Sequence, residues 1–116
     1  MSPSIRRNPA AARRATPAAV FAALGDKTRL ELIAKLSEGE PRSISELTQG
    51  SRLSRQAITK HLRTLEKARL VRGIRKGRES LFEFTPEPIL DARTYLEQVS
   101  SQWDQTLARS RAFVES

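Results

Sequence analysis

The segment from Ser54 to Ala68 carries two chemically different faces, and this feature constrains the fold more than any other part of the sequence. Five apolar side chains are spaced along it by one, three or four residues: Ala57, Ile58, Leu62, Leu65 and Ala68. In an α-helix this spacing gathers the apolar side chains on one side. The other side collects polar and basic residues, namely Arg55, Gln56, Thr59, Lys60, Arg63 and Lys67. The segment therefore predicts a helix that packs on a core with one face and exposes basic and amide groups on the other.

Two helices are predicted nearer the N-terminus. Residues 17–24 begin with a proline and are followed by Gly25, which is typical of a short helix. Asp26 suits the N-cap of a second helix, which carries an apolar stripe and ends at Gly39. We expect that stripe to consist of Leu30, Ile33 and Leu36, with Leu32 beside it.

A third short helix completes a recognisable motif. Ser43 and Glu46 have the spacing of a capping box, which opens a helix that ends at about Gly50. Four residues later Ser54 suits the N-cap of the two-faced helix. A short helix, a turn and a longer helix with a basic outer face form the pattern of a helix-turn-helix.

Beyond Ala68 the periodicity changes from that of a helix to that of strands. Residues 70–74 and 80–84 are rich in strand formers. Between them lies the sequence Arg-Lys-Gly-Arg, residues 75–78, which we expect to form the tip of a β-hairpin.

A long last helix follows the hairpin. Thr85 suits its N-cap and Pro86 its first position. Apolar residues recur along it from Ile89 onward and predict a helix of roughly 25 residues, about 38 Å long. Because this length exceeds a small domain, part of the apolar stripe needs cover from a second copy of the chain. We therefore expect a dimer.

Positive charge is concentrated in one part of the chain. The net charge is +8, and residues 51–78 contain ten Lys or Arg with a single acid, Glu66. Residues 79–116 instead contain seven acids and three bases. A charge that served solubility alone would be spread out, whereas a concentrated one is typical of a polyanion partner.

The composition argues against catalysis and metal binding. The chain has no cysteine and a single histidine, His61, and no second metal ligand lies at a suitable spacing from it. We interpret His61 as a structural or phosphate-facing residue. Neither a Gly-rich phosphate loop nor a defensible Ser-His-Asp arrangement is present. We expect no cofactor, no metal and no enzymatic activity. No apolar run approaches the ~18 residues of a membrane span, so no membrane partner is expected.

These elements predict a double-stranded DNA partner, because a recognition helix enters the major groove with its first turns facing the base edges. Arg63 is placed to reach phosphates, and the hairpin tip to follow the backbone or the minor groove. The residues expected to bind DNA are Ser54, Arg55, Gln56, Thr59, Lys60, Arg63, Arg75, Lys76 and Arg78.

The sequence resembles the ArsR/SmtB-type winged helix-turn-helix repressors. The run from Leu53 to Leu62, with Leu65, Ala68, Leu70 and Val71, is similar to the recognition-helix signature of that family. Residues 21–30 are similar to its first helix junction, and Gly77-Arg78 to its wing. The resemblance implies a mainly helical fold of about five helices plus a two-stranded wing over residues 70–84.

The resemblance also implies a bacterial homodimer, paired through its first and last helices, that represses by occupying a pseudo-palindromic operator. The interface residues that it implies are Val20, Phe21, Leu96, Val99, Trp103 and Leu107. It further implies a cytoplasmic, nucleoid-associated location.

The chain departs from the family at its sensor sites. The segment of residues 45–49, where sensor cysteines would fall, has no thiol, and the last helix has no histidine. The chain therefore looks closest to the metal-independent branch, with its effector open. Arg69 stands where the family has a glycine. In a left-handed conformation this arginine would cost roughly 1 kcal/mol.

Other interpretations stay open at this point. An RNA-associated or a protein-interaction winged helix would use the same elements, although the basic helix face carries no aromatic residue on which bases could stack. We expect residues 1–16 to form a flexible basic arm and residues 17–116 to form the domain with its dimerisation helix. The arginine-rich start also resembles a targeting segment, but its apolar run is short.

Overall fold

The computed structural model describes residues 15–115, and most of the expected arm, residues 1–14, lies outside this range. The two described residues of that arm belong to the folded domain. Ala15 packs against the core, and the Thr16 hydroxyl accepts a hydrogen bond from the Ala19 backbone N–H at 3.2 Å, which caps the first described helix.

Helix α2 (Pro17–Leu24) has the predicted bounds, and helix α3 (Lys27–Leu36) begins as predicted but ends three residues before Gly39, with Ser37 as its C-cap. Asp26 caps α3 as expected, because its carboxylate accepts from the Arg29 N–H at 3.0 Å. The expected stripe of α3 was wrong at one residue. Leu30 is 51% exposed, and Leu32 joins Ile33 and Leu36 in the core instead.

Helices α4 (Ile44–Thr48) and α5 (Arg55–Lys67) form the helix-turn-helix. The capping box is confirmed, since Ser43 Oγ accepts from the Glu46 N–H at 3.1 Å and the Ser43 N–H donates to Glu46 Oε1 at 3.0 Å. The Ser54 hydroxyl caps α5 by accepting from the Ala57 N–H at 3.1 Å. Both start signals in the sequence therefore act as predicted.

The sheet has three antiparallel strands rather than two. Strands β2 (Val71–Lys76) and β3 (Glu79–Phe84) form the hairpin, and β1 (Arg42–Ser43) pairs with β3 on its other edge. A two-residue strand is too short to leave a periodic signal, so the sequence did not predict β1. The strands run further than expected, which leaves only Gly77 and Arg78 in the turn. Gly77 has φ +64°, a conformation that glycine adopts without steric cost.

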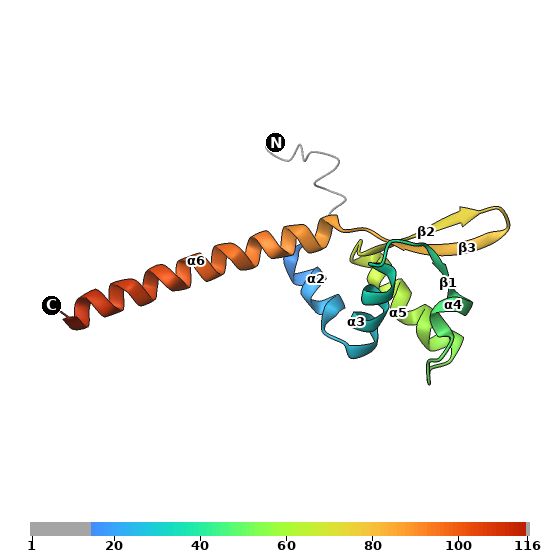
Figure 1. The fold of residues 1–116 in the computed structure, drawn as a ribbon, viewed down its shortest axis with the longest axis horizontal. Coiled ribbons are helices and arrows are strands. Elements are labelled where there is room, and N and C mark those ends of the chain that lie inside the picture. The colour runs from blue at the N-terminus through green and yellow to red at the C-terminus, as the bar shows by residue number, and fades with distance from the viewer. Residues whose placement is uncertain (1–14, 116) are drawn as a thin grey trace, which may run out of the picture.

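The core lies between α3, α4, α5 and the sheet, with α2 packed along one side (Figure 1). The largest fully buried side chains come from all of these layers: Val20, Leu36, Leu47, Ile58, Leu62, Leu65, Leu70 and Val71. No polar or charged residue among residues 15–115 is buried. The inner face of α5 is thus anchored by apolar packing.

Helix α6 (Glu87–Glu115) has 29 residues and a length of about 44 Å. Its base packs on α2, and its C-terminal part projects away from the domain (Figure 1). Residues 93–115 are all exposed. The stripe that we expected to outrun the domain does so in the structure.

The start of α6 differs from the prediction. Thr85 does not cap the helix: its hydroxyl donates to the Arg69 carbonyl and its N–H donates to the Leu70 carbonyl at 2.9 Å. Pro86 precedes the helix and supplies the first accepting carbonyl, to the Leu90 N–H at 3.0 Å. Thr85 therefore ties the base of α6 to the corner between α5 and β2. Arg69 at that corner has φ +62°, the left-handed conformation considered above.

Candidate nucleic-acid interface

Helix α5 presents the two faces that its sequence predicts. Ile58, Leu62 and Leu65 are buried, with exposures of 1%, 0% and 0%. On the opposite side the side chains of Arg55, Gln56, Lys60, Arg63 and Lys67 are exposed. Because the apolar face is held inside the domain, the basic face is fixed toward solvent.

Two of the expected DNA-binding residues use their hydroxyl groups within α5. Ser54 is the N-cap, and Thr59 is half-buried with its hydroxyl donating to the Arg55 carbonyl at 2.7 Å. Thr59 therefore offers a partner only its lone pairs and its methyl group. Arg55, Gln56 and Lys60 retain their donors near the start of the helix.

The wing stands beside the second half of α5. A groove of about 340 Å³ separates them and is lined by Arg63 of α5 and Arg75 of β2. Arg75, Lys76 and Arg78 are all exposed, the first two on β2 and the third in the turn. The tertiary structure thus brings Arg63 and Arg75, from two separated basic segments, to one groove.

Acidic side chains reduce the positive charge near these basic residues at two places. Glu66 Oε1 lies 3.0 Å from Arg63 Nη1, and Glu66 also lines the groove. Glu83 on β3 forms an ion pair with Arg72 on β2, directly across the ladder. Arg63 is consequently held in place by a carboxylate that a DNA phosphate would have to displace.

The structure adds polar residues that the sequence analysis did not assign. A second groove, between α4 and the start of α5, is lined by Arg55 together with Ser45 and Gln49. Their signal in the sequence was their place in the first helix of the motif, which crosses the DNA backbone in helix-turn-helix complexes. Ser45 and Gln49 are exposed and join the candidate interface.

The residues expected at a dimer interface fall into two groups. Phe21 on α2 is 36% exposed and its ring lies 6.2 Å from that of Tyr95 on α6. The expected residues of α6 are exposed by 42–60%: Leu96, Val99, Trp103 and Leu107. Val20 differs, because it is 1% exposed and belongs to the core of the protomer. A partner could not reach it.

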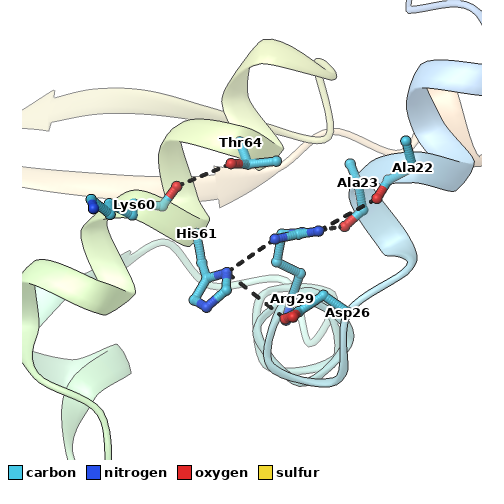
Figure 2. Close-up of polar contacts among 7 residues, drawn as sticks. All are labelled: Ala22, Ala23, Asp26, Arg29, Lys60, His61 and Thr64. Atoms are coloured by element: carbon cyan, nitrogen blue, oxygen red, sulfur yellow. Dashed lines mark hydrogen bonds and ion pairs between the residues drawn. The ribbon is translucent and has the colours of Figure 1, made fainter.

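His61 lies between the two faces of α5 and takes part in a polar cluster with Arg29 and Asp26 (Figure 2). The pKa of Asp26 is held below its usual range by its hydrogen bond from the Arg29 backbone N–H, against the opposing effect of desolvation. The nearby His61 and the Arg29 side chain lower this pKa further. The cluster thus joins the α2–α3 corner to α5.

The described residues offer no metal centre. Within residues 15–115 no group of three or more His, Cys, Asp or Glu side chains could hold a metal ion. Within the same range no helix has the length and apolarity to cross a bilayer.

Comparison with known proteins places these features in a family context. Residues 24–74 match a family model described as a helix-turn-helix domain. The chain is 42% identical over 77 residues to the uncharacterized HTH-type transcriptional regulator YuzN of Bacillus subtilis (strain 168), which covers 61% of this chain and 84% of that protein.

Two solved structures are similar in fold. An ArsR-like transcriptional regulator from Rhodococcus sp. RHA1 has a TM-score of 0.72 and 37% identity, over 79% of this chain and 86% of its own. The homodimeric winged helix-turn-helix DNA-binding domain of Mb0332 from Mycobacterium bovis, a possible ArsR-family regulator, has a TM-score of 0.56 and 22% identity. That match covers 78% of this chain and 80% of the other.

Proposed function

The chain belongs to the ArsR-type winged helix-turn-helix transcriptional regulators, and we propose that it is a homodimeric repressor that binds a pseudo-palindromic operator. The observation that carries the proposal is the set of exposed basic residues on the outer face of α5 and on the wing, with Arg63 and Arg75 lining the groove between them. Its counterpart is the exposed apolar stripe of α6. The first surface binds DNA, and the second pairs the protomers.

On the DNA side, α5 lies in the major groove with its N-terminal turns toward the bases. Arg55 and Gln56 are placed to read base edges, since bidentate donors and amides pair with guanine and adenine there. Lys60 and Arg63 lie further along and neutralise phosphates. The wing residues Arg75, Lys76 and Arg78 contact the backbone or the minor groove beside the site.

On the dimer side, α6 pairs with α6 of a second copy, and Phe21 of α2 closes the edge of the interface. A helix that projects this far with an apolar stripe is marginal in water without tertiary cover. The Mycobacterium bovis domain with the same fold is described as homodimeric. Two-fold symmetry then requires an operator with two related half-sites about one helical turn, or a multiple of it, apart.

Repression follows from occupancy, because a dimer across a promoter occludes it. The site of action is the bacterial cytoplasm, on chromosomal DNA. We propose that no metal releases this repressor through a thiolate site, because the chain has no cysteine.

The test is a fluorescence anisotropy titration with the duplex recovered by selection from fragments of the native genome. We expect the binding constant to fall steeply with salt, with a slope of about −0.9 per neutralised phosphate. Binding that does not depend on salt, or no binding at low salt, would contradict the proposal. An RNA duplex of the same sequence is the matched competitor. If RNA competes as well as DNA, the protein is an RNA-associated module.

A reporter placed behind the selected operator separates repression from activation. We expect deletion of the regulator to raise reporter output, and expression of the wild-type chain to lower it again. The Gln56→Ala variant should restore less repression at equal protein level. A reporter that falls on deletion would identify an activator.

A further inference from the structure

Besides apolar packing, the polar contact between α5 and the α2–α3 corner is made by one imidazole. His61 Nδ1 lies 3.2 Å from Arg29 Nη1 and 3.8 Å from Asp26 Oδ2 (Figure 2). The other polar contacts shown for α5 side chains stay within that helix or its cap, as for Thr59 and Thr64, whose hydroxyls donate to carbonyls one turn earlier. Among residues 15–115, His61 is therefore the polar side chain that relates α5 to a neighbouring helix.

Arg29 joins three helices at this point. It lies in the first turn of α3, and its guanidinium donates to the carbonyls of Ala22 and Ala23 in the last turn of α2 (Figure 2). The last C=O groups of a helix have no partner one turn further on. Of these two, the Ala22 carbonyl also accepts from the Gly25 backbone N–H at 3.3 Å. The third direction of the planar fork points to His61 on α5. One rigid side chain thus fixes the end of α2 and one face of α5 together.

The contact with Arg29 requires one form of the imidazole. A guanidinium carries donors only, so a hydrogen bond between the two side chains requires His61 Nδ1 to accept, with the ring proton on Nε2. Asp26 is too far from Nδ1 for a hydrogen bond, and its Oδ2 already accepts from the Arg29 N–H. The hydrogen-bond partner of His61 Nδ1 is therefore the Arg29 guanidinium and not the Asp26 carboxylate.

We propose that His61 is a positioning residue for DNA recognition: held by Arg29, it sets the angle at which α5 is presented relative to α2. Lys60 precedes it and Gln56 lies one turn earlier on the same helix. A recognition group must be held to within about 0.5 Å and 10–20° to keep its binding geometry. A contact that fixes the tilt of α5 therefore acts on specificity without touching DNA.

The consequence for spacing rests on the homodimer proposed above. Helix α2 packs on the base of α6. The Arg29–His61 contact consequently relates each α5 to the helices that pair the protomers, and so to the distance between the two half-sites.

Three variants separate this role from the alternatives. His61→Asn keeps an acceptor, because the Asn Oδ1 is bonded to Cγ as Nδ1 is. His61→Leu removes the acceptor and keeps an apolar body. Arg29→Lys keeps the charge but loses the planar fork. Affinity is measured by anisotropy for the selected duplex and for a scrambled duplex of equal length, and folding is followed by thermal melting.

We expect His61→Leu and Arg29→Lys each to lose about tenfold in affinity for the selected duplex, the loss that corresponds to one charge-assisted hydrogen bond. Affinity for the scrambled duplex should stay within about twofold, because phosphate contacts dominate there. His61→Asn should recover most of the loss. The double variant Arg29→Lys/His61→Leu should lose no more than either single variant, since both break the same contact.

Three results would overturn the proposal. Equal losses on both duplexes would make His61 a direct phosphate contact. Equal losses for His61→Leu and His61→Asn would show that the acceptor is irrelevant. Losses that multiply in the double variant would show that Arg29 and His61 act separately. If a variant has a lower melting temperature than the wild type, the affinities of the single and double variants are compared at a temperature at which all of them are folded.

The oligomeric state is measured on the same samples by sedimentation. If the wild type were a monomer and the variants still showed the expected order of affinities, the homodimer proposal would be wrong and the His61 proposal would stand. If the wild type were a dimer and His61→Leu had no effect on affinity, the His61 proposal would be wrong and the homodimer proposal would stand.

Discussion

Helix α5 and the outer half of α6 are both amphipathic, yet the chain treats their apolar residues in opposite ways. In α5 the apolar side chains are covered by α3, α4 and the sheet, and the face left over is basic. In α6 the apolar side chains from Leu96 to Leu107 stay exposed, because no other described element reaches that far (Figure 1). We infer that a helix face which its own chain leaves uncovered is a candidate interaction surface. On α5 the uncovered face is positively charged, and on α6 the uncovered face is apolar.

The largest expected effect concerns α6. Replacing Leu96 by Glu should raise the dimer dissociation constant about 100-fold or more, because symmetry places two carboxylates in the apolar interface. Gln98→Glu is the matched control, since position 98 lies on the other side of the helix from the stripe. Sedimentation velocity over a concentration series measures both variants. Equal dimer strength in the two variants would contradict the role of α6.

The next effect concerns the inner face of α5. Leu62 is fully buried, so Leu62→Ala should lower the free energy of unfolding by about 2–5 kcal/mol. Lys60→Ala on the outer face should change it by no more than about 0.5 kcal/mol. Denaturant unfolding of the two variants at one protein concentration gives the comparison. If the Lys60 variant were the less stable, the assignment of faces would be reversed.

The outer face of α5 should divide into base-reading and phosphate-binding residues. Gln56→Ala should cost about 1–3 kcal/mol on the selected duplex and relax the base preference at one position. Arg78→Ala should weaken binding to all duplexes alike and reduce the salt slope by about one. Repeated selection with each variant, together with a salt titration, distinguishes them. The same behaviour for both would show that the division is wrong.

A smaller effect in the opposite direction is expected at Glu66. Its carboxylate holds Arg63, so Glu66→Gln should free that guanidinium for a phosphate and raise affinity a few-fold, by about 0.5–1 kcal/mol. The gain should be the same for selected and scrambled duplexes and should disappear in the Arg63→Ala background. Anisotropy at one salt concentration measures it. Weaker binding by Glu66→Gln would mean that Glu66 serves to orient Arg63.

The smallest effect is a pH dependence at the α2–α3 corner. The pKa of Asp26 is lowered in the folded protein, mainly by its hydrogen bond from the Arg29 backbone N–H, so ionised Asp26 stabilises the fold at neutral pH. The contribution is lost as the pH falls through the folded pKa. Asp26→Asn keeps a cap but not the charge. The wild type should therefore melt at a higher temperature than Asp26→Asn at pH 7, and this difference should vanish in strongly acidic solution. If the difference in melting temperature persisted in strongly acidic solution, it would come from the packing of residue 26 and not from its charge.

Local signals in the sequence predicted the elements that depend on neighbouring residues. The caps at Asp26, Ser43 and Ser54 are side chains that accept from a backbone N–H three residues away, so they can be predicted from spacing alone. Thr85 was misjudged for the complementary reason. Its hydroxyl has a distant alternative, the Arg69 carbonyl, which sequence spacing does not reveal.

The sequence by itself determined the helix-turn-helix, the hairpin, the long last helix and the basic character of residues 51–78, because periodicity, capping and charge are properties of short segments. The tertiary structure alone decided which apolar residues face inward. It placed Val20 and Leu32 in the core and left Leu30 outside. It also added β1 to the sheet, set Arg63 against Arg75 across one groove, and brought Arg29 to His61. These relations join residues far apart in the chain, and only the packing of whole elements fixes their distances.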